Sequence, residues 1–291
     1  MPLINPLADA DGTWIRGSFH GHCDEHSACS SVPLVDSLRQ YEEVGAGFVT
    51  LTDHDHITDL GPARQQYPEL AFLHGFEYST RENVVFCGDS VDELFRLSLE
   101  EALTKAGDLL TIVCHAQPMG AAREYWTRPK LEALGTMPDG IEVYNGHYGT
   151  PTGRANGRQP LYNDFWDELL TAGHHVWGFG NDDFHDPEDF SNAWNMVHVD
   201  DVSAKGVVIA AKSGRSYATT GLLLEDLIVD GDHVEVHVSA DAKGRFVGPG
   251  ALVLASGEGA RFSYDAGDEA YVRFEAESDA GRVFLQPLWK T

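Results

Sequence analysis

Side chains that can ligate a metal ion follow most of the short apolar runs in this sequence. The densest stretch, WIRGSFHGHCDEHSACSS at 14–31, places His20 and His22 after the first apolar run. Two histidines at this spacing, at the end of a strand, can both turn toward one ion. The corresponding side chains after later runs are His54, Glu77, His115, Asp183 and His185, with His26, Glu142 and His147 close by.

A mixed set of histidines and carboxylates suits Zn²⁺, Mn²⁺ or Fe²⁺ better than it suits a structural tetrathiolate zinc site. So many ligands predict two or three divalent ions, and paired ions about 3.5–4 Å apart can generate hydroxide and clamp substrate oxygens. For His26, Glu142 and His147 a structural role competes with metal binding. Each motif alone has an ordinary structural explanation, so the prediction depends on their recurrence at successive strand ends.

The four cysteines are Cys23, Cys29, Cys87 and Cys114, and none forms a CxxC pair. In a chain of this length they do not indicate a disulfide framework. We expect reduced, buried thiols, and for Cys23 a packing role rather than metal binding.

Apolar runs and their spacing predict the elements that must position the candidate ligands. Strands are expected at 13–19, 46–52, 70–79, 109–116, 140–146, 175–182 and 193–200, with 83–89 as a candidate extra strand. Helices are expected after a Ser31 cap, with Pro33 in the first turn, and over 91–106, 160–172 and 202–214. About seven repeats of strand, loop and helix favour parallel strands whose C-terminal ends gather at one mouth.

The pattern changes at about residue 222, where apolar and polar residues alternate between Gly and Asp turns. Such alternation is typical of antiparallel strands. We therefore expect a barrel over 1–221 and a small β-rich module, packed on the barrel, over 222–291.

The composition narrows the classes of partner. Lys plus Arg number 20 and Asp plus Glu 46, a formal charge of −26, which argues against a nucleic-acid polymer because phosphate contacts need a basic face. It also argues against an anionic membrane surface. No run approaches the ~20 apolar residues of a membrane helix, and no secretory signal is recognised at the start. We expect a cytoplasmic protein that acts on a small molecule, and the oligomeric state stays open.

The order of the motifs resembles a known family. FHGH, TLTDHDH, GFE, CHAQP, GIEVYNG and NDDFH look like successive motifs of the PHP (polymerase and histidinol phosphatase) superfamily over about residues 14–221. GRSYATTG at 214–221, followed by the β-rich end, is similar to the free-standing bacterial branch that includes carbaryl-hydrolase-like proteins.

The resemblance implies an α/β fold, a distorted (β/α)7 barrel related to the TIM barrel, with up to three metals at its mouth. It assigns His20, His22 and Asp183 to the first metal, Glu77 to a bridge between the first and second, His115 to the second, and His54 and His185 to a third. His26 lies slightly off the family's usual spacing for a ligand of the third ion. Glu142 and His147 compete for the remaining place on the second ion, so a two-ion site stays an alternative.

These observations predict a phosphoesterase that hydrolyses a small phosphorylated molecule, a nucleotide or a sugar phosphate, by a metal-bound hydroxide. Asp55 or His56 could move a proton to the leaving group, and Arg81 and Arg215 are candidate phosphate contacts. Hydrolysis of a carbamate or carboxylic ester at the same site is an alternative. A non-catalytic regulatory barrel is a third hypothesis, which missing ligands would favour.

Overall fold

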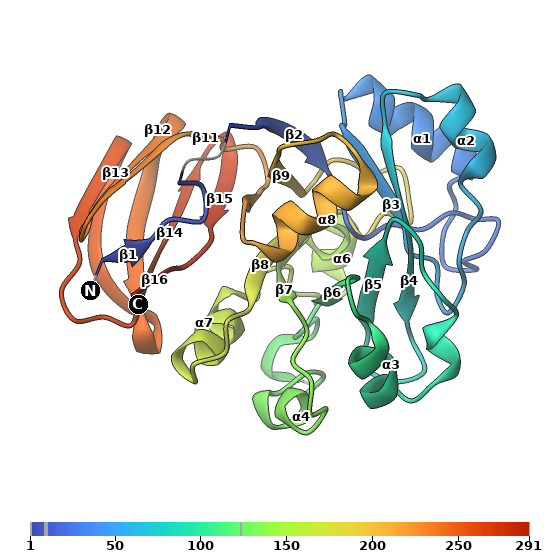
Figure 1. Cartoon of the computed structure of the whole chain (residues 1–291), viewed down its shortest axis with the longest axis horizontal. Helices are drawn as coiled ribbons and strands as arrows, with labels where there is room; N and C mark the ends of the chain where they lie inside the picture. The colour runs from blue at the N-terminus through green and yellow to red at the C-terminus, as the bar shows by residue number, and fades with distance from the viewer. Residues whose placement is uncertain (1, 9–10, 123, 291) are drawn as a thin grey trace.

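A curved sheet of six strands forms the centre of the computed structural model, which describes residues 2–8, 11–122 and 124–290 (Figure 1). Its strands, in spatial order, are β3 (Phe48–Leu51), β4 (Ala71–Tyr78), β5 (Val84–Gly88), β6 (Leu110–Val113), β7 (Gly140–Asn145) and β8 (Trp177–Asn181). Most residues of these strands are buried, which explains their nearly continuous apolar runs.

The segment 18–22 connects the two edges of this sheet. It follows β2 (Thr13–Gly17) and lies between the ends of β3 and β8. The Thr52 N–H donates to the Gly21 carbonyl at 2.8 Å, and the His22 N–H donates to the Phe184 carbonyl at 2.9 Å. These bonds place the first two candidate ligands, His20 and His22, between strand ends that are distant in sequence.

The predicted barrel of seven parallel strands is not confirmed. β5 runs antiparallel to both β4 and β6, and β2 pairs antiparallel with β9 (Trp194–Val199) outside the six-stranded sheet. The connection 79–83 between β4 and β5 is too short for a crossover helix, so β5 must return in the opposite direction. An apolar run predicts a buried strand but not its direction.

Short helices surround the sheet. They are α1 (Leu34–Glu43), α2 (Gly61–Gln66), α3 (Leu99–Lys105), α4 (Arg128–Glu132), α5 (Gly146–Gly149), α6 (Pro151–Ala155), α7 (Asn163–Thr171) and α8 (Ala204–Lys212), with 3₁₀ turns η1 (Leu94–Arg96), η2 (Gly120–Ala122) and η3 (Pro249–Ala251). Within the described ranges no helix is both long and apolar enough to cross a membrane.

Two predicted helices begin or divide differently from the prediction. The expected cap at Ser31 is wrong, because Pro33 is the extended residue before α1 and the Glu25 carboxylate accepts from the Leu34 N–H at 2.9 Å. The expected helix over 91–106 is split into η1 and α3, since Ser98 forms a capping box with Glu101 and starts a new helix.

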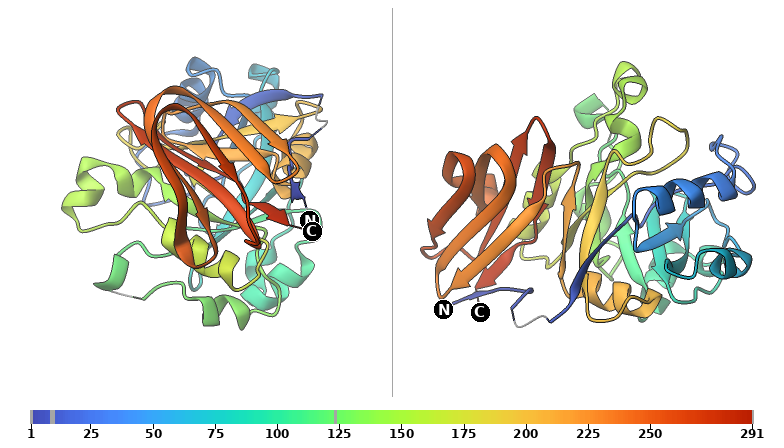
Figure 2. Two further views of the ribbon diagram at one scale, coloured as in Figure 1. Left: turned by 90° about the vertical axis from the view of Figure 1, so that its left-hand side faces the viewer. Right: turned by 90° about the horizontal axis from the view of Figure 1, so that it is seen from above.

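The remaining strands form a large antiparallel sheet that reaches from β2 and β9, in the middle of the molecule, to one end of it (Figure 1). Besides β2 and β9 it contains β1 (Leu3–Ile4), β10 (Ser216–Thr219), β11 (Leu224–Asp230), β12 (His233–Gly248), β13 (Leu252–Asp265), β14 (Tyr271–Ser278), β15 (Gly281–Leu285) and β16 (Leu288–Lys290). β1 pairs with β16, so the two ends of the chain lie together (Figure 2). β10 pairs with both β9 and β15, so hydrogen bonding continues past residue 222, and a separate C-terminal module is not confirmed.

A buried ion-pair cluster joins α7 to the antiparallel sheet. Arg273 is buried, and its guanidinium donates two hydrogen bonds, of 2.7 and 2.6 Å, to the Asp167 carboxylate of α7. It also donates to Glu275 on its own strand at 2.5 Å. This geometry satisfies a charge that would be costly to bury alone.

Replacement of Arg273 by Met should lower the free energy of unfolding by about 3–5 kcal/mol, because the Asp167 carboxylate would stay buried without its cation and Glu275 would keep only Arg245. Urea unfolding of the full chain measures this change. The matched control is Arg282→Met, which removes a surface pair with Glu277 and should cost about 1 kcal/mol or less. Equal effects of the two variants would contradict the role given to Arg273.

Candidate metal centre

The structure brings the predicted ligands together at one end of the curved sheet. His20 and His22 lie in the closing segment 18–22, and the others lie at or just beyond strand ends: His54 after β3, Glu77 in β4, His115 after β6, and Asp183 and His185 after β8. Most of these side chains are buried, and that of His54 is 35% exposed. Strand ends distant in sequence thus supply one cluster.

Four electron-pair donors converge at its centre. The Nε2 atoms of His20 and His22 lie 3.2 Å apart. Asp183 Oδ1 lies 3.1 and 3.3 Å from these two nitrogens. Glu77 Oε2 approaches the same nitrogens at 3.3 and 3.4 Å.

The outer partners of the histidines leave these Nε2 atoms unprotonated. His20 Nδ1 is 2.8 Å from a carboxylate oxygen of Glu142, which only accepts, so the ring proton is assigned to Nδ1. His22 Nδ1 is 3.3 Å from the Ser27 hydroxyl, which itself donates to Asp53 at 2.6 Å and therefore accepts from the ring. Such partners fix the tautomer of metal-ligating histidines.

This arrangement of donors fits a divalent cation. Glu77 Oε2 and Asp183 Oδ1 are buried and have no hydrogen-bond partner in the described structure. Buried carboxylate oxygens without partners are costly, and four lone pairs facing one another repel. A cation among them removes both costs, and the imidazole and carboxylate donors suit Zn²⁺, Mn²⁺ or Fe²⁺.

The electrostatic field of the cluster also favours a bound cation. Burial would raise the pKa of Glu77, but the positive charge that His20 carries when it is protonated, together with the contact from His115, holds that pKa well below its usual range. Burial would lower the pKa of His20, yet the charge of Asp183 and other nearby negative charges raises it well above its usual range. The field that attracts protons to this cluster also favours a bound cation.

Backbone strain at two ligands shows how firmly they are positioned. Asp183 has φ 50° and His115 has φ 28°, in the left-handed region. A non-glycine residue there costs about 1–3 kcal/mol and persists only where its surroundings enforce it. The Asp183 N–H donates to the His20 carbonyl, and the His115 N–H donates to Glu142. The closing segment and Glu142 therefore hold both residues.

Glu77 lies between the central donors and two further histidines. Its Oε1 atom is 3.1 Å from His115 Nε2, and its Oε2 atom is 2.9 Å from His54 Nδ1. The two oxygens thus face different histidines. This arrangement suits the predicted bridge between two ions.

The hydrogen bonds of Glu142 identify it as a positioning residue. Its two oxygens accept from His20 Nδ1, the His115 N–H, Asn145 and Asn181, at 2.6 to 3.1 Å. Because four donors occupy its lone pairs, we interpret Glu142 as an outer partner of the ligands and not as a ligand.

His26 and His147, the other two open candidates, differ in their surroundings. His26 is exposed, and its ring stacks on that of His56 with the two ring centroids 4.0 Å apart. His147 Nδ1 bonds Asp189 at 2.9 Å, and its ring centroid lies 4.8 Å from that of His185. His147 therefore stays a candidate ligand. Among the described contacts, the His26 ring has none with His20, His22, Glu77 or Asp183.

A cleft of about 380 Å³ opens beside the cluster. It is lined by Cys29, His54, Glu77, Asn83, His115, Pro118, Met119, Tyr125, His147, Tyr148, Arg158, Asp183 and His185. Arg158 is the one lysine or arginine among these described lining residues, and its guanidinium lies 4.9 Å from the centre of the Tyr148 ring. The cleft thus combines the candidate ligands with a cation and two tyrosines.

The predicted proton-transfer and phosphate-binding residues are placed elsewhere. Asp55 accepts hydrogen bonds from the Ser79 N–H and hydroxyl, and neither Asp55 nor His56 lines the described cleft. Arg81 pairs with Glu82 and Glu100. Arg215 pairs with Asp200. Both arginines are occupied by carboxylates, so the structure favours Arg158 as the cation that faces a substrate.

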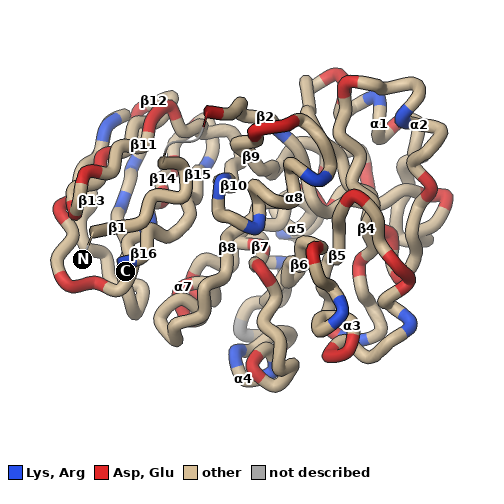
Figure 3. The backbone as a smooth tube through the Cα atoms, viewed as in Figure 1, with Lys and Arg blue, Asp and Glu red and all other residues tan. Residues whose placement is uncertain are grey.

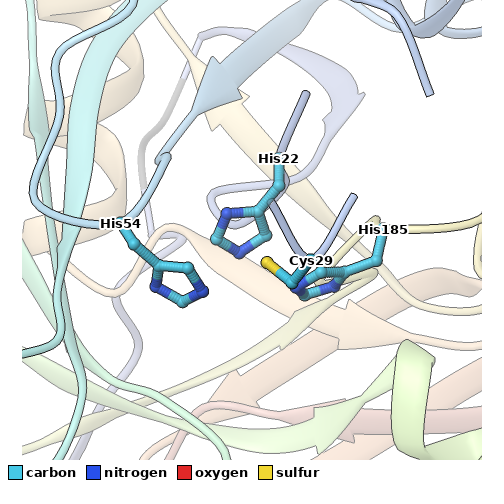
Figure 4. Close-up of side chains that lie close together, drawn as sticks. All are labelled: His22, Cys29, His54 and His185. Carbon is cyan, nitrogen blue, oxygen red and sulfur yellow. The ribbon is translucent and has the colours of Figure 1, made fainter. Parts of the chain in front are cut away.

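One thiol differs from the prediction that all four are buried. Cys23, Cys87 and Cys114 are buried, as expected, whereas Cys29 is exposed in the loop after His22. Its sulfur lies within 4.8 Å of ligand atoms of His22, His54 and His185 (Figure 4). Sequence reasoning missed Cys29 and Arg158, although Cys29 lies in the same short loop as the first histidines.

Comparison with solved structures finds a protein of similar fold over nearly the whole chain. No family model matches the chain, and no curated protein sequence matches it either. A two-domain protein of Bacteroides vulgatus containing a predicted PHP-like metal-dependent phosphoesterase is 17% identical, with 96% of each chain covered and a TM-score of 0.55.

The chain has this PHP-like fold. At 17% identity the likeness establishes the architecture, and it confirms the expected resemblance at that level. A lesion-specific endonuclease of Pyrococcus furiosus is also similar, at 17% identity and a TM-score of 0.44, over 69% of this chain and 56% of that one. In the PHP-like fold of the present chain, the cluster and its cleft lie at the strand ends described above.

Replacement of Glu77 by Gln should reduce tightly bound metal by at least one ion per chain, because Gln supplies no negative charge and only one acceptor. Elemental analysis after loading with Mn²⁺ or Zn²⁺ and desalting measures this change. Asp89→Asn, which removes an exposed acid outside the cluster, is the control and should keep the full metal content. Unchanged metal content in Glu77→Gln, with native circular dichroism, would contradict the assigned site.

Proposed function

We propose that the protein is a metal-dependent phosphoesterase that hydrolyses a small phosphorylated molecule of the nucleotide or sugar phosphate class. The observation that carries the proposal is the convergence of His20, His22, Glu77 and Asp183 on one point, with two buried carboxylate oxygens lacking partners. Two or three divalent ions held here would supply Lewis-acid activation of water and of phosphoryl oxygens at neutral pH. The PHP-like fold supports this reading.

The chain's own residues position the ions and the substrate. Glu142 orients His20 through Nδ1 and holds the His115 backbone. Arg158 is the cation that would contact a phosphate oxygen, since it lines the cleft and none of the ion pairs among the described residues includes it. Tyr125 and Tyr148 supply aromatic walls that suit a nucleoside base or a ring-shaped leaving group.

The size and charge of the molecule support a small substrate. A cleft of about 380 Å³ lies within the range typical of small-ligand sites, about 300–1,000 Å³. Lys and Arg positions are interspersed with more numerous Asp and Glu positions along the chain (Figure 3). A nucleic-acid polymer would need a continuous basic face, so we infer a free small molecule as substrate.

The remaining assignments are part of the same proposal. We assign the hydrolase to the barrel-like region over 1–221, and the β-rich region over 222–291 to a module packed on it. The buried Arg273 cluster, which joins α7 to β14, supports firm packing between these regions. A cytoplasmic location is consistent with the free thiols.

A substrate panel tests the reaction. Metal-loaded protein should hydrolyse p-nitrophenyl phosphate, its diester analogue or a nucleotide faster than an aryl carbamate. Arg158→Ala should lower kcat/KM for the best phosphate ester roughly 100-fold, because one preorganised cationic contact to the developing charge is lost. Metal content should be unchanged, since Arg158 is not a ligand.

Arg96→Ala is the matched control, because Arg96 pairs with Glu93 on the surface and should leave kcat/KM unchanged. Turnover of the carbamate alone would overturn the phosphoesterase assignment in favour of the ester hydrolase. Absence of turnover with a full metal complement would favour the non-catalytic alternative.

A further inference from the structure

We propose that the Cys29 thiolate is a metal ligand, completing with His54 and His185 a third ion site of mixed nitrogen and sulfur donors. The inference rests on the metal centre of the proposed function but not on the phosphoesterase reaction. Sequence reasoning assigned no metal to this thiol and expected a centre without thiolates.

The geometry of the side chains carries the proposal. Ligand atoms of His22, Cys29, His54 and His185 all lie within 4.8 Å of one another. They come from the loop after β2, the end of β3 and the loop after β8, and they face a common point (Figure 4). One ion is within reach of Cys29, His54 and His185, while His22 Nε2 faces the central donors.

The loop that carries Cys29 is anchored on both sides of the thiol. Before it, the Ser27 hydroxyl donates to Asp53 at 2.6 Å. After it, the Ser31 N–H and the Ser30 hydroxyl donate to the carbonyl of His185 at 2.8 and 3.0 Å. The loop is therefore bonded directly to the backbone of another proposed ligand, so the thiol is held beside the two histidines.

The histidines are prepared for ligation in the same way as the central pair. His185 Nδ1 bonds the Asp183 carbonyl at 2.6 Å, so its ring proton is assigned to Nδ1 and Nε2 is left with a lone pair. His54 Nδ1 is buried and makes no hydrogen bond in the described structure, although Glu77 Oε2 lies 2.9 Å away. Both rings thus offer an unprotonated or unpartnered nitrogen near the sulfur.

The donor set predicts which ion this site selects. Thiolate and imidazole donors favour Zn²⁺ over Mn²⁺ or Mg²⁺, whereas the carboxylate-rich donors around Glu77 and Asp183 accept harder ions. The thiolate also adds a negative charge to a site whose other two ligands are neutral. We therefore expect one zinc-selective position beside a more permissive pair.

Cobalt substitution of the full-length protein tests the proposal without an activity measurement. Addition of Co²⁺ to chelator-treated protein should produce a near-ultraviolet thiolate-to-cobalt charge-transfer band. The band should disappear in Cys29→Ser and persist in Cys114→Ser, the control for the buried thiol near His20. The affinity of the third site for Zn²⁺ should fall by more than roughly 10-fold in Cys29→Ser, because the loss of a direct ligand weakens binding at least as much as the loss of an outer hydrogen-bond partner.

A measurement on the unchanged chain covers the case in which Cys29→Ser does not fold. Cys29 is the exposed cysteine in the described structure, so N-ethylmaleimide should alkylate it in metal-free protein, and Zn²⁺ should protect it. Peptide mass mapping reads the modified thiol.

The outcomes separate this proposal from the proposed reaction. Binding of Co²⁺ without a thiolate band, a band that survives in Cys29→Ser, or alkylation unaffected by Zn²⁺ would each overturn the Cys29 site and leave the phosphoesterase proposal standing. Failure of Co²⁺ to bind at all would overturn both. A Cys29-dependent band with no phosphate ester turned over would support the site and count against the reaction.

Discussion

The site depends on one electrostatic constraint: two imidazole nitrogens and two carboxylate oxygens face one another, and each oxygen lies 3.1–3.4 Å from both nitrogens. His20 Nε2 and His22 Nε2 face Glu77 Oε2 and Asp183 Oδ1, and neither carboxylate oxygen accepts a hydrogen bond in the described structure. Such an arrangement is unfavourable unless a cation lies among the donors. The metal requirement therefore follows from geometry before any comparison with other proteins.

Two features of the fold hold the four donors in place. The closing segment 18–22 brings both histidines between β3 and β8 by backbone hydrogen bonds to Gly21 and Phe184. An outer layer of acceptors, chiefly Glu142 and Asp53, then fixes ring orientation and tautomer. The strained backbone at Asp183 and His115 is tolerated because these same groups hold it.

Residue type and position predicted much of this centre, because a metal-capable side chain at the end of an apolar run can be found once that run is recognised as a strand. The central four donors, with His54, His115 and His185, were found in this way. Other features depend on neighbours that a linear pattern does not contain. Glu142 orients ligands because four donors surround it, and Cys29 faces the cluster because its loop is bonded to His185.

The architecture was predicted in part for similar reasons. Buried strands gave clear apolar runs, but the direction of β5 depends on a short connection and the partner of β2 on tertiary contacts. Arg81 and Arg215 were chosen by their nearness in sequence to the motifs, yet nearby carboxylates already pair with both. Arg158, on a loop without a motif, has no comparable sequence signal.

The most direct test is a crystal structure of metal-loaded protein with anomalous diffraction at the absorption edges of zinc, manganese and iron. We expect an anomalous peak within bonding distance of His20 Nε2, His22 Nε2 and Asp183 Oδ1, with Glu77 contacting it. Fully loaded crystals in which these four side chains converge and no anomalous peak lies among them would contradict this expectation.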